Sequence, residues 1–372
     1  MIRTKFYFFV LLIFIILINT IHADVVDINA KAYILMDVST GRVLYGKNDN
    51  IKLPMASTTK IMTVILAIES GRLDEIVTIS RNASIQEGSS IYLKEGEKIK
   101  LEDLLYAVML RSGNDASVAV AEHLCGSVEK FAELMNKKAK EIGAYNTNFT
   151  NPHGLPDENH YTTAYDLGLI TCYALKNNKF SEIVKTKKKT IPGPAEEDWD
   201  RVMTNKNKML WQFDGGDGVK TGYTKKAGRC LVASATRNNW QLVSVVLNCA
   251  DMWNVSSQLL EYGFNNYKKI HAIDKNVPYK HIKVQKGKKE ITGVYPEDDL
   301  YIPVKINGEE EELSFKDNIT MYAKAPIYEN QKAGQLEVYI DNTLVGKIDL
   351  VYRENIEPTS IIYYIKKILK TL

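Results

Sequence analysis

The hydrophobic pattern predicts a hairpin followed by a buried helix near the start of the chain. Residues 32–37 and 42–45 are β-rich and flank the turn-forming triplet Ser39-Thr40-Gly41, an arrangement typical of a β-hairpin. The positions from 61 to 68 are almost continuously apolar. A helix that is apolar on every side is buried in a core. Ser57 is therefore predicted to stand at the N-terminal end of a central helix.

Helical spacing of apolar residues continues through the middle of the chain. It predicts helices over residues 101–110 and 116–124, with a connecting loop at 112–114. Another helix is predicted over 127–142. Ser127 is its expected N-cap, because a serine side chain accepts hydrogen bonds from the first amide groups of a helix.

The pattern then changes from helices to strands. Residues 220–235 and 240–248 are rich in β-forming side chains, and Asn238-Asn239 lies between them as a turn signal. Lys220 is accordingly predicted to begin a strand. An early hairpin, a helical middle and late antiparallel strands that join one sheet predict an α+β domain, which we place at residues 24–270.

Beyond about residue 269, short β-type runs alternate with turns. Asn307-Gly308 and Asp341-Asn342 are typical hairpin turns. The pattern predicts a small all-β domain over 271–355, in which the acidic run 309–312 is expected to be a solvated turn. The predicted strands are 282–285, 300–306, 319–323, 336–340 and 347–351.

The N-terminal end has a basic and then an apolar segment. Arg3 and Lys5 precede an apolar run from 6 to 18, and Ala23 follows shortly after it. This order is typical of a secretory signal peptide. The run is short for a membrane-spanning helix, which needs about 20 apolar residues. We therefore predict a signal peptide over 1–23 and an exported protein, with an uncleaved anchor as the alternative.

The C-terminal end repeats apolar residues at helical spacing, with three lysines mainly off the apolar face. A helix of about 14 residues is too short to cross a bilayer but long enough to lie in its surface. We predict a membrane-anchor helix over 356–372. Packing of this helix on the β domain is the alternative. The apolar positions are Ile361, Ile362, Ile365, Ile368, Leu369 and Leu372.

Length and composition narrow the range of partners. A chain of 372 residues exceeds one ordinary core, and a formal net charge of +3 gives no reason to expect nucleic acid. No His-Glu-x-x-His motif and no Cys-x-x-Cys pair is present, so we predict neither metal nor cofactor.

We expect the cysteines to be reduced and packed, although a disulfide between Cys230 and Cys249 is conceivable in an exported protein. The four cysteines are Cys125, Cys172, Cys230 and Cys249.

Candidate chemistry comes from three motifs that occur in order along the chain. A serine hydroxyl is a poor nucleophile until a base removes its proton. Ser57 and Lys60 are three residues apart, so a helix places them on one face. Lysine serves as a base when burial or a second cation, here Lys220, lowers its pKa. Another Ser-x-x-Lys, at 127–130, is explained by the N-cap. The three motifs are Ser57-Thr58-Thr59-Lys60, Ser112-Gly113-Asn114 and Lys220-Thr221-Gly222.

These motifs and their flanks resemble the serine D-alanyl-D-alanine carboxypeptidases, the low-molecular-mass penicillin-binding proteins. The resemblance runs from about Ala30 to about Phe264 and includes residues 43–48, 151–155 and 217–224. It implies the penicillin-recognising, β-lactamase-like serine transpeptidase fold. It also implies removal of the terminal D-alanine from peptidoglycan stem peptides through an acyl-enzyme, acylation by β-lactam antibiotics, and a role in cell-wall maturation at the outer face of the cytoplasmic membrane.

The same resemblance implies the roles of the catalytic residues. Ser57 would be the nucleophile and Lys60 its base, and Ser112 would relay a proton to the leaving group. The backbone N–H groups of Ser57 and Tyr223 would form an oxyanion hole, worth about 3 kcal/mol per donor.

The resemblance assigns substrate binding to four further residues. Asn114 would bind a substrate amide, and Lys220, Thr221 and Gly222 would bind the end that carries the terminal carboxylate. Some relatives have an arginine after the strand that follows Lys-Thr-Gly. Residues 248–258 contain none in this chain, so a further carboxylate-binding residue is left open.

Two other functions are alternatives at this point. A class A-like β-lactamase needs a glutamate positioned as a base for rapid deacylation. The only acidic cluster in the relevant stretch is 196–198, which lacks the context of that loop. A catalytically silent wall-binding protein would retain the fold alone, and the presence of all three motifs argues against it.

Overall fold

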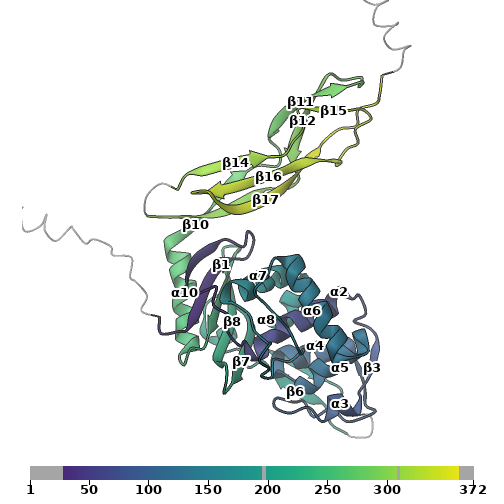
Figure 1. Ribbon diagram of the computed structural model, residues 1–372, viewed down its shortest axis with the longest axis vertical. Coiled ribbons are helices and arrows are strands. Elements are labelled where there is room, and N and C mark those ends of the chain that lie inside the picture. The colour runs from purple at the N-terminus through teal and green to yellow at the C-terminus, as the bar shows by residue number, and fades with distance from the viewer. Residues whose placement is uncertain (1–27, 195–197, 308–310, 360–372) are drawn as a thin grey trace, which may run out of the picture.

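The computed structural model describes residues 28–194, 198–307 and 311–359. A part built of helices and strands extends to the end of α10 (Met252–Asn266), and an all-strand part begins with β10 (Tyr267–Ile273) (Figure 1). The predicted α+β fold followed by a small all-β domain is confirmed. The predicted signal peptide and the apolar C-terminal positions lie outside the described residues. Within the described residues, no helix is both long and apolar enough to cross a membrane.

A five-stranded antiparallel sheet forms the centre of the first part, in the order β2-β1-β9-β8-β7. The predicted hairpin is present, and its first strand pairs with β9, so strands from both ends of the domain share one sheet. The edge strand β7 carries the Lys-Thr-Gly motif. The strands are β1 (Ala32–Asp37), β2 (Val43–Lys47), β7 (Gly216–Thr224), β8 (Gly228–Arg237) and β9 (Trp240–Leu247).

The strand predicted to begin at Lys220 begins earlier, at Gly216, and residues 220–235 form parts of two strands. Lys220 therefore lies in the interior of β7, and the prediction that it begins a strand is wrong. The reason is the glycine-rich approach, because glycine is depleted in strands. Here Gly218 has φ +88° and the pairing with β8 shifts between Gly216 and Gly218, as at a β-bulge.

Helices cover both faces of this sheet. Successive residues of β1 enter different cores, because side chains alternate across a strand. Leu35 packs in the cluster that contains Leu259 of α10, whereas Ile34 packs in the larger cluster that contains Ile61 and other helical residues. The helices of the larger cluster are α2 (Lys60–Glu69), α4 (Leu101–Tyr106), α5 (Asn114–Cys125), α6 (Val128–Ile142), α7 (Ala164–Leu175) and α8 (Asn178–Lys185).

Short elements connect the helices, and two of them, η1 (Ala56–Thr59) and η2 (Ala107–Arg111), adjoin the first two motifs. The predicted helix over 101–110 consists of α4 and a π-helical turn, η2 (Ala107–Arg111). Ser127 is the N-cap of α6 as predicted, since its side chain accepts a hydrogen bond from the Lys130 amide at 3.2 Å. The other short elements are η1 (Ala56–Thr59), β3 (Ile76–Thr78), α3 (Arg81–Ser84), β4 (Lys98–Lys100), β5 (Lys188–Ile191), β6 (Arg201–Thr204) and α9 (Met209–Gln212).

The β domain contains a six-stranded sheet in the order β14-β16-β17-β12-β11-β15 and the pair β10–β13. Four of the predicted runs are strands, the run 319–323 is strand only from Tyr322, and β10, β12 and β14 were not predicted. The turn at Asp341-Asn342 is confirmed, with both φ angles positive. The strands are β11 (Lys280–Gln285), β12 (Ile291–Pro296), β13 (Leu300–Lys305), β14 (Leu313–Asp317), β15 (Tyr322–Lys324), β16 (Lys332–Ile340) and β17 (Thr343–Tyr352).

A polar contact joins the two parts of the chain. Arg42, beside the β1–β2 turn, forms a 2.7 Å ion pair with Glu311 and donates to the carbonyl of Pro303. Tyr267 donates a 2.7 Å hydrogen bond to the carbonyl of Leu44. The prediction that the acidic run 309–312 is only a solvated turn is therefore wrong for Glu311, whose partner lies 269 residues earlier and has no local signature.

Candidate active site

Ser57 and Lys60 meet at the start of the central helix. Ser57 lies in the turn η1, and Lys60 is the first residue of α2. The Nζ atom of Lys60 lies 3.1 Å from Ser57 Oγ. Lys60 is completely buried, whereas Ser57 is half-buried and reaches the surface. The predicted pair is therefore in hydrogen-bond contact, and the serine of the pair is accessible.

The other contacts of Lys60 fix the direction of its amine. Nζ donates to Asn114 Oδ1 at 2.7 Å and to the carbonyl of His153 at 2.6 Å. A neutral amine has two N–H bonds and one lone pair. These two acceptors engage both N–H bonds, so the lone pair of a neutral Lys60 faces the third neighbour, the hydroxyl of Ser57.

The electrostatics of the site favour the neutral form of Lys60. Burial lowers its pKa well below the usual value, and the positive charges of Lys220 and Lys206 lower it further, against the opposing effect of Asp115. Burial and the charge of Lys206 also lower the pKa of Lys220, to about 7. The second cation predicted from the sequence is present, and a third, Lys206, accompanies it.

The second motif supplies Ser112 and Asn114 from the junction of η2 and α5. Ser112 ends η2 in the left-handed conformation, with φ 65°. Asn114 Nδ2 donates to the carbonyl of Glu87 at 2.5 Å. Its Oδ1 accepts from Lys60 at 2.7 Å, so Asn114 fixes the position of the Lys60 amine and has a second side-chain N–H beyond the one that Glu87 accepts. Among the residues that the structure describes, the Ser112 hydroxyl has no hydrogen-bond partner.

The third motif lies along β7, the strand at the edge of the sheet next to η1. Gly222 approaches Ser57 so closely that a Cβ on Gly222 would lie 3.0 Å from the Ser57 amide nitrogen. Any side chain at position 222 would crowd that amide, which explains the glycine. Lys220 is buried and its Nζ donates to the Thr221 carbonyl at 2.8 Å, while the side chain of Tyr223 is exposed.

The segment Asn151-Pro152-His153-Gly154-Leu155 packs against η1 and the start of α2. Gly154 has φ +87°, and a Cβ there would lie 1.8 Å from the Ala56 carbonyl oxygen, so only glycine fits against η1. His160 Nε2 lies 2.7 Å from Thr59 Oγ1, and its Nδ1 accepts from the Thr150 amide. Burial lowers the pKa of His153 to about 3 and of His160 to about 4, so both rings are neutral near pH 7.

Comparison with known families agrees with this geometry. The family described as D-alanyl-D-alanine carboxypeptidase matches residues 19–251, more than half of the 372-residue chain. The chain belongs to the D-alanyl-D-alanine carboxypeptidase family. A second match, to the C-terminal domain of penicillin-binding protein 5, covers residues 267–358. As a member of this family the chain is a serine peptidase with a cell-wall-related function, and acylation by penicillin is general among such enzymes.

Individual relatives resemble the chain over nearly its whole length. The D-alanyl-D-alanine carboxypeptidase DacF of Bacillus subtilis is 34% identical over 91% of this chain and 88% of its own. The crystal structure of penicillin-binding protein 5 from Haemophilus influenzae matches with a TM-score of 0.73 at 30% identity, covering 89% of this chain and 98% of that one. A peptidoglycan synthesis regulatory factor (PBP3) from Streptococcus pneumoniae matches with a TM-score of 0.74 at 26% identity, covering 89% of this chain and 100% of that one.

Lys206 is a residue of this carboxypeptidase that the sequence analysis missed. It follows β6, and its amide donates to the carbonyl of Leu110, beside the second motif. Its side chain is exposed and close enough to Lys60 and Lys220 to lower both pKa values. The only signal was a lysine between two asparagines, Asn205 and Asn207, which has no recognisable meaning before the fold is known.

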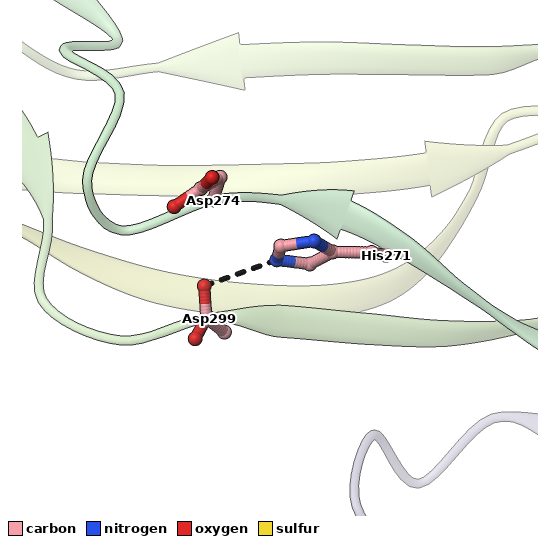
Figure 2. Close-up of side chains that lie close together, drawn as sticks. All are labelled: His271, Asp274 and Asp299. Carbon is pink, nitrogen blue, oxygen red and sulfur yellow. Dashed lines mark hydrogen bonds and ion pairs between the residues drawn. The ribbon is translucent and has the colours of Figure 1, made fainter.

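A cluster of potential metal ligands lies elsewhere in the carboxypeptidase, in its β domain. Figure 2 shows His271, Asp274 and Asp299 close together, with donor atoms within 4.8 Å of one another. Asp299 Oδ1 already lies 3.0 Å from His271 Nε2 and accepts from the Lys275 amide at 3.1 Å. We assign this cluster a structural role, joining the end of β10 to the turn before β13.

Proposed function

We propose that this D-alanyl-D-alanine carboxypeptidase uses Ser57 as its nucleophile and Lys60 as a neutral general base to release the terminal D-alanine of peptidoglycan stem peptides. The observation that carries this assignment is the set of contacts around Lys60. Nζ contacts two carbonyl-type acceptors and Ser57 Oγ, which is 3.1 Å away, so in the neutral form, with both N–H bonds engaged, the lone pair faces Ser57. Mass spectrometry of the penicillin adduct, with its peptide mapped, tests the assignment.

The reaction follows from these positions. Lys60 takes the proton of the Ser57 hydroxyl, and Oγ attacks the carbonyl carbon of the penultimate D-alanine. The amides of Ser57 and Tyr223 stabilise the oxyanion. Ser112, whose hydroxyl has no partner within the described part of the chain, passes a proton to the departing amine of D-alanine. The peptide C–N bond then breaks, and water later hydrolyses the serine ester to regenerate Ser57.

The cations beside β7 suit the terminal carboxylate of the substrate. In this proposal Lys220 and Thr221 bind the carboxylate. Lys206 binds it as well, in place of the arginine that residues 248–258 lack. Lys206 is supported by its exposure and by its effect on the pKa of Lys220. Charge-assisted hydrogen bonds to a carboxylate are about twice as strong as neutral ones.

Substitution of Lys206 is expected to weaken substrate binding and to extend activity to higher pH. Lys206→Gln should raise the KM for a D-Ala-D-Ala peptide about tenfold at pH 7, with a small change in kcat. Removal of this charge also raises the pKa of Lys220 above about 7, because the Lys206 cation lowers it. Lys220 then stays protonated to higher pH, so the alkaline decline of kcat/KM should shift upward. Steady-state kinetics between pH 6 and 10 measure both.

Lys208→Gln is the matched control, since Lys208 is exposed, lies two residues further along the chain and contacts the ring of Trp253. We expect it to leave both KM and the pH profile unchanged. Equal KM values for the two variants would show that Lys206 does not bind the carboxylate.

We also propose where the enzyme acts, which is outside the cytoplasmic membrane. A signal peptide over 1–23 exports the enzyme, and the C-terminal segment attaches it to the outer face of the cytoplasmic membrane. Cell-wall action of the family supports export. The described chain remains part of the β domain up to residue 359, since Pro358 bridges Gly287 and the Thr359 amide donates to the Lys286 carbonyl. The apolar positions from Ile361 onward follow directly.

Truncation after Thr359 is expected to release the enzyme from membranes. The truncated chain should keep its activity on soluble peptide but lose most of its sedimentation with anionic vesicles at low salt. Six aliphatic side chains and three lysines are removed, and each lysine near such a surface contributes about 1 kcal/mol. Vesicle sedimentation measures the effect. Equal sedimentation of the truncated and untruncated chains would exclude anchoring by this segment.

A further inference from the structure

One face of the β domain combines exposed apolar side chains with lysines. Strand β11 pairs with β12 on one side and with β15 on the other. In this register Lys283 lies between Ile291 of β12 and Tyr322 of β15. Ile291 is 57% exposed, Tyr322 is 56% exposed and the neighbouring Met321 is 79% exposed. We call the surface formed by Lys283, Ile291, Met321 and Tyr322 the outer face.

The outer face is hollowed and positively charged. A hollow of about 720 Å³ lies over it, lined by β11 and by Ile291, Met321 and Tyr322. Lys283, Lys286 and Lys324 are exposed around it, and none of the three forms an ion pair within the described residues. Exposed apolar side chains are ordinary when single, but a contiguous group rimmed by charge is typical of a binding surface.

The position of this face indicates its partner. In Figure 1 strands β11, β12 and β15 lie at the end of the β domain away from the catalytic domain. The described chain ends there as well, because the Thr359 amide donates to the carbonyl of Lys286 at 2.7 Å. The segment that follows is the apolar, lysine-bearing stretch for which we proposed membrane contact. The outer face and that segment therefore start from the same end of the molecule.

We propose that the outer face is a second membrane-contact surface, which lies against anionic lipid beside the C-terminal segment. Ile291, Met321 and Tyr322 enter the headgroup region, and the unpaired lysines contact lipid phosphates. An anionic wall polymer could bind the lysines, but it would leave the apolar side chains exposed to water. Anionic lipid can contact both, so it fits the face better. This inference adds to the tail contact proposed above and is tested separately from it.

The test uses the processed chain, isolated after export, with its N-terminus determined by mass spectrometry. A face variant replaces the three apolar side chains by threonine, which suits strands: Ile291→Thr, Met321→Thr and Tyr322→Thr. Its partition onto vesicles of phosphatidylglycerol and phosphatidylcholine should fall about tenfold, from the loss of apolar burial. Penicillin labelling should remain unchanged, because these residues lie outside the catalytic domain.

The matched control replaces exposed apolar residues elsewhere on the same domain: Val277→Thr, Phe315→Thr and Leu344→Thr. It should partition like the parent chain. Equal partition of the face and control variants overturns the proposal. So does a lowered melting temperature of the face variant with unchanged vesicle binding, because the face would then serve as the packing site of the C-terminal segment.

Two further variants separate this proposal from the tail anchor. A lysine variant, Lys283→Gln with Lys286→Gln and Lys324→Gln, should lose about a hundredfold in partition onto anionic vesicles at low salt and nothing on neutral ones, since each lysine contributes about 1 kcal/mol. It also keeps the proposal testable if the face variant fails to fold. A tail variant, Ile361→Ser with Ile365→Ser and Ile368→Ser, tests the anchor alone. If only the tail variant lost vesicle binding, the face proposal would be wrong and the anchor proposal would stand. If only the face variant lost vesicle binding, the anchor proposal would be wrong and the face proposal would stand.

Discussion

Ser57→Ala is expected to abolish both penicillin labelling and D-alanine release. Ser57 Oγ lies 3.1 Å from Lys60 Nζ, and Gly222 closely approaches the backbone amide of Ser57. Loss of a serine nucleophile typically costs a factor on the order of 10⁴ to 10⁶ in rate, because no other group forms the covalent intermediate. Intact-mass measurement after incubation with penicillin, together with an assay of released D-alanine, measures both effects.

Ser127→Ala is the matched control, because Ser127 belongs to the other Ser-x-x-Lys pattern in the chain. Its hydroxyl caps α6, so the substitution should reduce the free energy of unfolding by about 1 kcal/mol and leave labelling intact. A circular dichroism melt confirms that both variants are folded. A penicillin adduct on the Ser57→Ala protein would refute the assignment of the nucleophile.

The fold could be predicted where the sequence pattern is local. The hairpin β1–β2, the buried helix α2 and the N-cap Ser127 depend on periodicity and turn chemistry, which a short window contains. The start of β7 was misplaced because its glycines bend the backbone and shift its pairing with β8. The ion pair between Arg42 and Glu311 could not be predicted, since it depends on how two domains meet.

In the candidate site, too, only the features set by nearby residues could be predicted from the sequence. The three-residue spacing alone predicted the contact between Ser57 and Lys60. The roles of the residues in the other two motifs came from the family resemblance. The carbonyl of His153 was missed because a backbone oxygen has no signature in sequence, although it accepts one of the two N–H bonds of Lys60. Lys206 was missed because its position beside Leu110 becomes evident only from the fold.

Lys60→Arg is expected to reduce acylation by several orders of magnitude while the protein still folds. A guanidinium retains a positive charge and similar reach, but its pKa is above about 12, so it does not accept the Ser57 proton near neutral pH. Lys60, in contrast, has a pKa lowered by burial and by Lys220 and Lys206. Loss of a general base costs about 10²- to 10⁴-fold. Stopped-flow measurement of acylation by a chromogenic cephalosporin gives the rate.

The pH profile of the parent enzyme separates the base role from a purely structural one. A base must be deprotonated, so acylation should rise as pH increases through the lowered pKa of Lys60 and should not need pH values near 10. In Lys60→Arg this rise should disappear, leaving a low rate that does not follow the titration of a lysine. If the arginine variant acylated at a near-normal rate with the same profile, Lys60 would not be the base. The proton of Ser57 would then have to leave by another route, and Ser112, the other serine of the proposed site, would be the next residue to substitute.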